Sequence, residues 1–200
     1  MKPLATWTAA IATLAVAAPL SAHHSIAMFD LADPIWVKGT VVRYEPIPPH
    51  ALITLEERID GEHIQRWFVE GPPPEALKRA GLGPEFLKVG DVIETCAFAL
   101  KGEFATRGLL AHIDGSFVHG HVLVMPDGRL RMWGSYGKID NCVRPNDPLE
   151  RWVDFLNTDA GARGFWCNRL TWAMPLSASA PKSLVDEISK QMAKPCDPSP

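Results

Sequence analysis

The sequence predicts a mainly β protein: an OB-like small β-barrel with one short inserted helix, followed by a disulfide-bound helical C-terminal extension. Three observations predict this fold class. Between residues 35 and 133, segments rich in β-branched and aromatic residues alternate with turn signals. One short helical segment interrupts them after the third strand segment. Beyond Gly134, the chain changes to amphipathic helical segments separated by Gly, Pro and Asn.

The first 22 residues have the order of parts found in a secretory signal peptide. Lys2 gives a positive start, residues 4–20 form an uncharged and mostly apolar run, and Ala22 is a small residue at the expected cleavage position. The run is too short and too rich in alanine for a retained membrane anchor, which is the alternative. We therefore expect a periplasmic protein whose mature chain begins at His23.

The next segments predict a strand followed by a β-hairpin over residues 51–70. Residues 37–44 are β-branched and aromatic, residues 51–56 alternate, and residues 65–70 return after the turn signal at Asp60-Gly61. The alternation of the second strand predicts one apolar face, formed by Ala51, Ile53 and Leu55, and one polar face, formed by Thr54 and Glu56.

After three consecutive prolines, residues 75–80 predict a short helix that ends at Gly81. Further strands are expected at residues 92–100, 109–113, 117–125 and 130–133. Three strands, a helix and then further strands is the order of an OB-type barrel. An immunoglobulin-like sandwich is the alternative, but the helix between the third and fourth strands counts against it.

The remaining chain predicts a helical extension over residues 135–200, packed on a barrel domain of residues 23–134. In the segment 148–156, the large apolar side chains fall on one helix face: Leu149, Trp152, Val153 and Leu156. A second helix is expected from Ser183, which has Asp186 three residues later.

The chain has four cysteines and no C-x-x-C pair: Cys96, Cys142, Cys167 and Cys196. In an oxidising compartment, this pattern predicts two disulfides, for which three connectivities are possible. We favour Cys142–Cys167 within the extension and Cys96–Cys196 between the tail and the barrel. Free buried thiols are the alternative.

Several short motifs occur in a fixed order before residue 133. They are His23-His24-Ser25, Phe29-Asp30, Lys38-Gly39-Thr40-Val41, Pro49-His50-Ala51, Trp67-Phe68-Val69-Glu70-Gly71 and Leu87-Lys88-Val89-Gly90-Asp91. In this order the chain resembles a family of uncharacterised bacterial periplasmic proteins, a domain of unknown function, over about residues 22–133. The resemblance implies a small periplasmic β-barrel and no established activity. Pro48 departs from the family, which usually has Asn at that position.

Charge and motifs narrow the function classes. The net charge of −3 becomes −4 in the mature chain, with both signs mixed along it and no basic run, so we expect no nucleic-acid partner. A Gly-x-Ser-x-Gly elbow, a His-Glu-x-x-His motif and a phosphate-binding glycine loop are all absent from the sequence, so it singles out no catalytic residues.

The predicted mature terminus is the sharpest chemical feature. His23 would carry a free α-amine and an imidazole, and these two nitrogens can chelate one metal ion. A further imidazole from His24 or His50 would complete a nitrogen plane that suits Cu(II), the arrangement called a histidine brace. Both kinds of nitrogen can lose their proton near neutral pH. A solvated or hydrogen-bonded polar arm is the alternative.

Two other features could take part. His119 and His121 are two residues apart, so on a regular strand both would face one ion, although an ordinary pair of surface histidines is favoured. Glu70 either closes a turn or accepts a hydrogen bond that orients a metal-binding histidine. Trp67, Trp133 and Trp152 are expected to serve as packing residues.

Three functions are thus open. The first is a non-enzymatic periplasmic binding protein whose favoured ligand is copper. The second is a module that binds an unknown periplasmic protein or a small molecule without metal. A metal-dependent enzyme ranks last.

Overall fold

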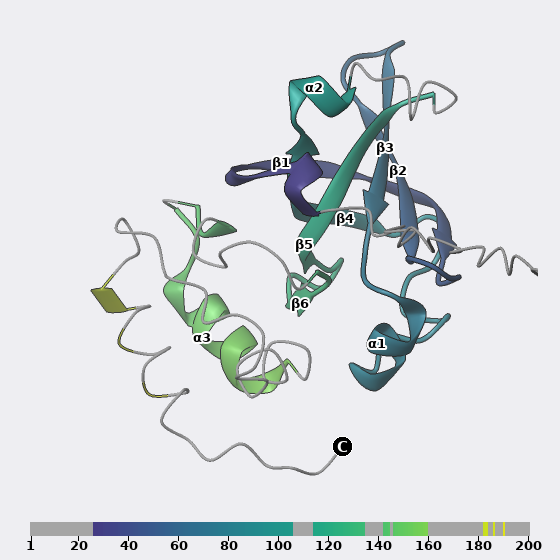
Figure 1. Cartoon of the computed structure of the whole chain (residues 1–200). Helices are drawn as coiled ribbons and strands as arrows, with labels where there is room; N and C mark the ends of the chain where they lie inside the picture. Colours follow the sequence, from purple (N-terminus) through teal and green to yellow (C-terminus); the bar gives the residue numbers. More distant parts are fainter. Residues whose placement is uncertain are drawn as a thin grey trace, which may run out of the picture.

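The computed structural model describes residues 26–105, 114–134, 142–144 and 146–159, together with residues 182, 183, 186 and 190. The described strands are β1 (Phe29–Glu45), β2 (Leu52–Arg58), β3 (Ile64–Glu70), β4 (Val92–Leu100), β5 (Ser116–Val124) and β6 (Leu130–Met132). The described helical elements are η1 (Ile26–Met28), α1 (Pro74–Arg79), α2 (Gly102–Ala105) and α3 (Leu149–Thr158). Figure 1 shows their arrangement.

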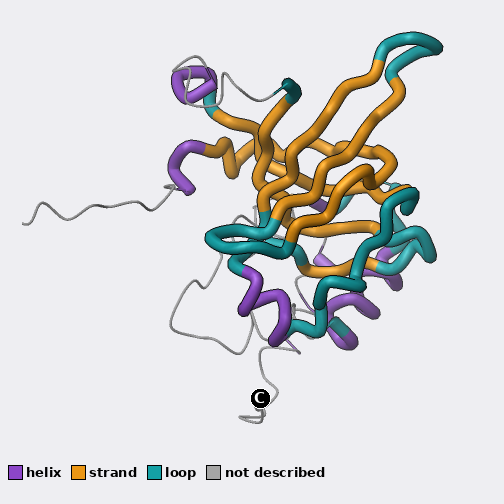
Figure 2. The backbone as a smooth tube through the Cα atoms, turned by 90° about the vertical axis from the view of Figure 1, so that its right-hand side faces the viewer, coloured by secondary structure: helices purple, strands orange, loops and turns teal. Residues whose placement is uncertain are grey.

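Five of these strands form a closed barrel in the order β1-β2-β3-β5-β4. The long strand β1 pairs antiparallel with β2 along one part and with β4 along another. The barrel closes because β3 and β5 pair in parallel, while β4 and β5 pair antiparallel. Figure 2 shows the strands wrapped around a common interior. The OB-like barrel is therefore confirmed, and the sandwich alternative is wrong, because one sheet closes on itself.

The barrel interior follows the alternation of the sequence. Ala51, Ile53 and Leu55 are fully buried in it, as the pattern of the second strand predicts. Strands β1, β4 and β5 contribute further members: Val37, Val41, Ile93, Ala97, Val118 and Leu123. Burial of this apolar surface is the main favourable contribution to folding.

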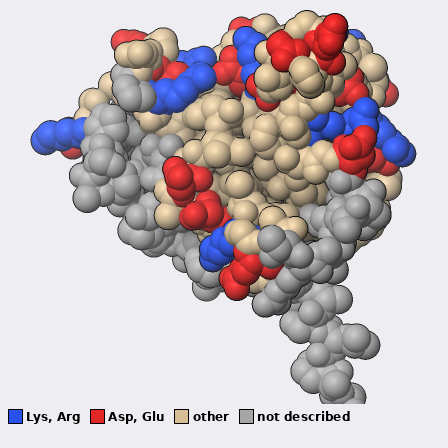
Figure 3. Space-filling view, turned by 90° about the horizontal axis from the view of Figure 1, so that it is seen from above, with Lys and Arg blue, Asp and Glu red and all other residues tan. Residues whose placement is uncertain are grey.

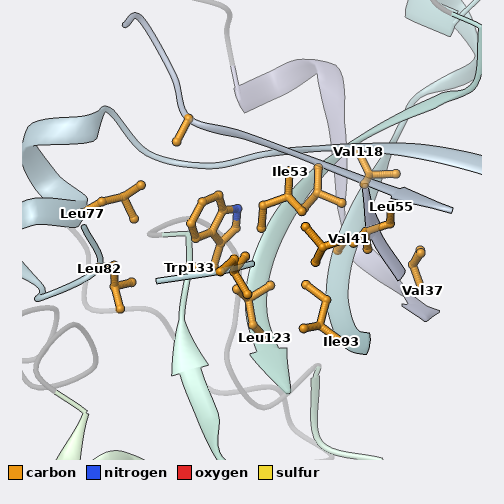
Figure 4. Close-up of a cluster of buried hydrophobic side chains, with 14 residues drawn as sticks. Val37, Val41, Ile53, Leu55, Leu77, Leu82, Ile93, Val118, Leu123 and Trp133 are labelled. Atoms are coloured by element: carbon orange, nitrogen blue, oxygen red, sulfur yellow. The ribbon is translucent and has the colours of Figure 1, made fainter. Parts of the chain in front are cut away.

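The indole of Trp133 closes one end of the barrel. It lies between the α1 region, with Leu77 and Leu82, and the barrel residues Ile53 and Leu123 (Figure 4). Helix α1 begins at Pro74, where a missing N–H costs nothing, and ends before Gly81, whose φ of +75° favours glycine. The helix that interrupts the strands thus covers the Trp133 end.

The extension packs on the outer face of the barrel. Trp152 and Phe155 of α3 lie in a second apolar cluster with outward-facing residues of β5 and β6, namely Val122, Val124, Leu130 and Met132. Arg144 adds a polar attachment: its guanidinium stacks over Trp36 at 4.2 Å from the ring centroid and lies 2.8 Å from a carboxylate oxygen of Glu94. The helix at 148–156 is confirmed.

The disulfide differs from our prediction. Cys96 pairs with Cys142, with 5.7 Å between their Cα atoms, so the pairings Cys142–Cys167 and Cys96–Cys196 are wrong. Along β4, Ile93 and Ala97 face the interior, so Cys96 faces outward to the place where the extension begins. Cys167 and Cys196 lie outside the described residues.

Other element boundaries differ in detail. Strand β1 begins at Phe29, eight residues before the expected start, and its pairing with β4 shifts register between Phe29 and Pro34. The strand expected at 109–113 lies outside the described residues, as does most of the helix expected from Ser183. No helix within the described residues has the length and apolar character that a bilayer span requires.

Candidate functional site

Barrel closure places two polar residues side by side on its outer face. Glu70 and His119 are directly paired in the parallel ladder between β3 and β5. Their neighbours Val69 and Val118 point into the interior, so both polar side chains point outward. Nevertheless, the two side chains are only 10% and 3% exposed. The Nδ1 atom of His119 lies 3.5 Å from Oε2 of Glu70.

A loop brings a second imidazole to the same carboxylate. His50 follows a cis peptide bond between Pro48 and Pro49 and precedes β2. Its Nδ1 atom lies 2.9 Å from Oε1 of Glu70, and its side chain is 32% exposed. Each carboxylate oxygen of Glu70 thus faces the Nδ1 atom of a different histidine.

The contact of His50 at 2.9 Å has the length of a charge-assisted interaction, whereas that of His119 at 3.5 Å is longer. Neither contact has the geometry of a hydrogen bond. Site hydrogen bonds are often poorly aligned before a ligand binds, and they tighten on binding. A carboxylate beside Nδ1 favours the tautomer that carries its proton there. For His50, Nε2 is then the nitrogen that can coordinate a metal ion.

The backbone around Glu70 is held by close packing. The indole N–H of Trp133 donates to the carbonyl oxygen of Glu70 at 3.2 Å. A Cβ atom at Gly71 would collide with the Trp133 ring, and one at Gly120 would come within 2.5 Å of Trp133 Cδ1. These glycines are required because the backbone approaches the indole closely.

His119 and His121 are not surface residues, so that expectation is wrong. The ring of His119 packs 5.4 Å from Phe29, and the ring of His121, which is fully buried, packs 5.6 Å from Phe98. A bulge in β5 opposite the step from Cys96 to Ala97 interrupts the regular alternation of side chains there.

Burial also determines the charge of His121. Desolvation is the main cause that lowers the pKa of His121, to about 3, and the charge of His119 is the second. A hydrogen bond with the backbone of Gly134 acts in the opposite direction. His121 is therefore neutral at physiological pH.

The sequence-predicted ligands divide into two groups. His50 lies at the site, whereas His23 and His24 lie outside the described residues. Among the described residues, no three His, Cys, Asp or Glu side chains gather in a way that could hold a metal ion. A site at His50 therefore needs donors from elsewhere, and a site at His119 and His121 would need them too.

The sequence suggested Glu70 as a hydrogen-bond acceptor for a histidine, but it did not predict the contact of Glu70 with His119. The parallel pairing of β3 and β5 makes that connection across 49 positions of chain, and no local pattern encodes it. Charged residues elsewhere are mixed: the face in Figure 3 carries acidic and basic side chains near one another in several places around a central area of uncharged residues.

A family model described as a family of unknown function (DUF6152) matches residues 10–109. The match spans half of the chain. The chain belongs to this family. The segment shared with the family includes the candidate residues His23, His24, His50 and Glu70, whereas His119 and the extension lie beyond it. No curated protein matches the chain.

Proposed function

We propose that this member of the family is an exported, periplasmic, non-enzymatic protein that binds a transition metal, with copper favoured. The ligands are the α-amine and imidazole of His23 after removal of residues 1–22, and Nε2 of His50, with His24 adjacent. The observation that carries the proposal is the contact of 2.9 Å between Nδ1 of His50 and the buried carboxylate of Glu70.

That contact has the form of a carboxylate–histidine–metal arrangement. A carboxylate on Nδ1 fixes the tautomer and orientation of the ring and raises the basicity of the coordinating nitrogen. Glu70 is well placed for this role because its backbone is fixed in β3 and by Trp133. The exposed third of His50 lets an ion reach the ring.

The path of the chain supports participation of the mature terminus. Phe29, whose ring packs on His119, is six positions after His23. Residues 26–28 form η1, so only the three positions before them can be extended, and these span at most about 10 Å. His119 in turn contacts the carboxylate that contacts His50. A mature terminus at His23 would thus be joined by a short segment to the side of the cluster formed by Phe29 and His119, which supports its participation.

Three nitrogen donors, one of them an amine, favour Cu(II) in a tetragonal geometry. The described residues at the site contribute no thiolate, because Cys96 and Cys142 are joined to each other. Copper binding through neutral nitrogen donors releases protons and weakens as pH falls.

The alternative, a module that binds a protein or small molecule without metal, has one observation in its favour. A groove of about 430 Å³ runs over β1, β2 and the starts of β3 and β4. The exposed side chains of Ile64 and Val92 line it together with Lys38 and Arg58. The groove lies at one end of the β2–β3 pair, and Glu70 lies at the opposite end.

The test is a Cu(II) titration of protein whose first residue is His23, in competition with a chelator. We expect a dissociation constant below micromolar and electron paramagnetic resonance splittings from three nitrogens. An added glycine before His23, or His50→Gln, should each weaken binding by about tenfold or more. His63→Gln is the matched control, since that side chain is 78% exposed at the β2–β3 turn.

Two results would overturn the proposal: binding no tighter than micromolar in the processed protein, or equal affinity with and without the added glycine. In either case, the interaction module becomes the better description, and ligand screening should begin at the Ile64–Val92 groove.

A further inference from the structure

The two carboxylate oxygens of Glu70 lie beside two different histidines, His119 and His50. Oε2 lies 3.5 Å from Nδ1 of His119, and Oε1 lies 2.9 Å from Nδ1 of His50. A carboxylate that is nine-tenths buried needs a polar group for each oxygen, because desolvation of the charge is otherwise costly.

The two histidines differ in how firmly they are held. His119 lies within β5, is 3% exposed and packs against Phe29. On another side, a Cβ atom at Gly134 would come within 3.1 Å of His119 Nε2, so the chain passes close to that nitrogen. His50 lies outside the strands and is one-third exposed. The rigid partner of the carboxylate is therefore His119, and the adjustable partner is His50.

We propose that His119 is a positioning residue that acts through Glu70 to hold His50 with its proton on Nδ1 and with Nε2 presented for a ligand. The chain of contacts runs from the buried strand to the exposed loop. His119 does not itself coordinate the ion, because its Nδ1 faces the carboxylate and its Nε2 lies against the backbone at Gly134.

The inference has one part that rests on the proposed function and one that does not. The binding of the ion at Nε2 of His50 rests on the proposed function. The control of the His50 tautomer by His119 and Glu70 is a property of the metal-free protein, and it is measured in that form. The failure of one part is thus distinguishable from the failure of the other.

The first measurement is ¹⁵N nuclear magnetic resonance of the histidine side chains in metal-free protein that begins at His23. We expect both His119 and His50 to carry the proton on Nδ1. If His119 carries it on Nε2 instead, the inference is wrong, whatever any variant shows.

The second measurement compares His119→Asn with His119→Phe. The amide N–H of Asn can replace the Nδ1 donor, so this variant should retain the tautomer of His50 and the affinity for Cu(II). The ring of Phe fills the space but donates nothing. His119→Phe should therefore give a mixture of His50 tautomers and weaken Cu(II) binding by about tenfold, the usual effect of losing a group behind a metal ligand.

Val118→Ala is the matched control, because Val118 precedes His119 in β5, is buried, and faces the barrel interior. It should lower stability without changing the tautomer of His50. Equal effects of Val118→Ala and His119→Phe, or a wild-type tautomer in His119→Phe, would show that His119 has only a structural role. A normal tautomer pattern with no copper binding would leave the positioning intact and reject the metal.

Discussion

Glu70 and His119 are opposite each other in the parallel ladder of β3 and β5, with 3.5 Å between Oε2 and Nδ1. This ladder is the pairing that closes the barrel, so the acidic group and the buried imidazole meet only when the fold is complete. His50 then reaches the same carboxylate from the loop before β2. The candidate site is consequently a property of the closed barrel and not of any single segment.

Gly120→Ala should destabilise the barrel at the closure. An added Cβ would come within 2.5 Å of Trp133 Cδ1 and 2.6 Å of Val69 Cγ1. Overpacking of this kind costs about 1–3 kcal/mol, only partly offset by the lower entropy of Ala in the unfolded chain. Urea unfolding measures the change.

Gly61→Ala is the control for that experiment, because nothing lies within 4 Å of a Cβ at Gly61. It should alter the free energy of unfolding by less than about 0.5 kcal/mol. If Gly120→Ala is equally harmless, the approach of β5 to the indole is not as close as described.

Removal of the disulfide should loosen the attachment of the extension. The double variant Cys96→Ser, Cys142→Ser opens a loop that spans 46 positions. The chain-entropy estimate for a loop of this size is about 4 kcal/mol of lost stability. Urea unfolding of oxidised wild type and of the variant provides the measurement.

The pairing itself is checked by a second variant, Cys167→Ser, Cys196→Ser, which should still contain one disulfide by intact mass. Free thiols at Cys96 and Cys142 in that variant would contradict the pairing found here.

Local patterns predicted the strands well and the long-range partners poorly. The alternation of Ala51, Ile53 and Leu55 was sufficient to place them inside, because side-chain direction in a strand depends on parity alone. Cys96 shows the limit. Its outward direction follows from parity, but its partner depends on where the extension docks, which sequence spacing does not encode.

His121 shows a second limit of local patterns. Strand periodicity predicted that it would share a face with His119, and a surface position was favoured for both. Instead, a bulge places His121 at an irregular position, and the fold buries it completely. Glu70 was predicted in part. The sequence allowed two interpretations, one of them an acceptor for a histidine, whereas its contact with His119 forms only in the closed barrel.

Arg144→Met should weaken the docking of the extension. The change keeps a long apolar stem but removes the cation that stacks on Trp36 and pairs with Glu94 and Asp147. We expect a loss of about 1–3 kcal/mol, because the partner carboxylates lose a charged donor. The change is measured by urea unfolding.

Arg129→Met is the matched change at an exposed position, where the arginine pairs only with its near neighbour Asp127 among the interactions described. Isolated surface pairs contribute about 0–1 kcal/mol, so this variant should remain close to wild type. A similar loss in both variants would mean that Arg144 does not hold the extension.

His121 should make the stability of the protein fall as the solution becomes acidic. In the folded chain, burial lowers the pKa of His121 to about 3. The charge of His119 acts in the same direction, and the backbone interaction with Gly134 opposes it. An unfolded histidine has a pKa near 6.5. Below that value, the unfolded state binds a proton that the folded state excludes, so the free energy of unfolding decreases by about 1.4 kcal/mol per pH unit. The decrease continues until the pH approaches the folded value.

His121→Leu removes this proton and keeps an apolar side chain in a buried position. Urea unfolding of metal-free protein at pH 7.5 and at pH 5.5 gives the change in stability for each variant. Wild type should lose about 1.4 kcal/mol more over this interval than His121→Leu. His63→Gln, at an exposed position, should behave as wild type. Because each variant is compared with itself at two pH values, any constant loss from the substitution cancels. An equal pH dependence in wild type and His121→Leu would show that the buried imidazole is not the group that titrates.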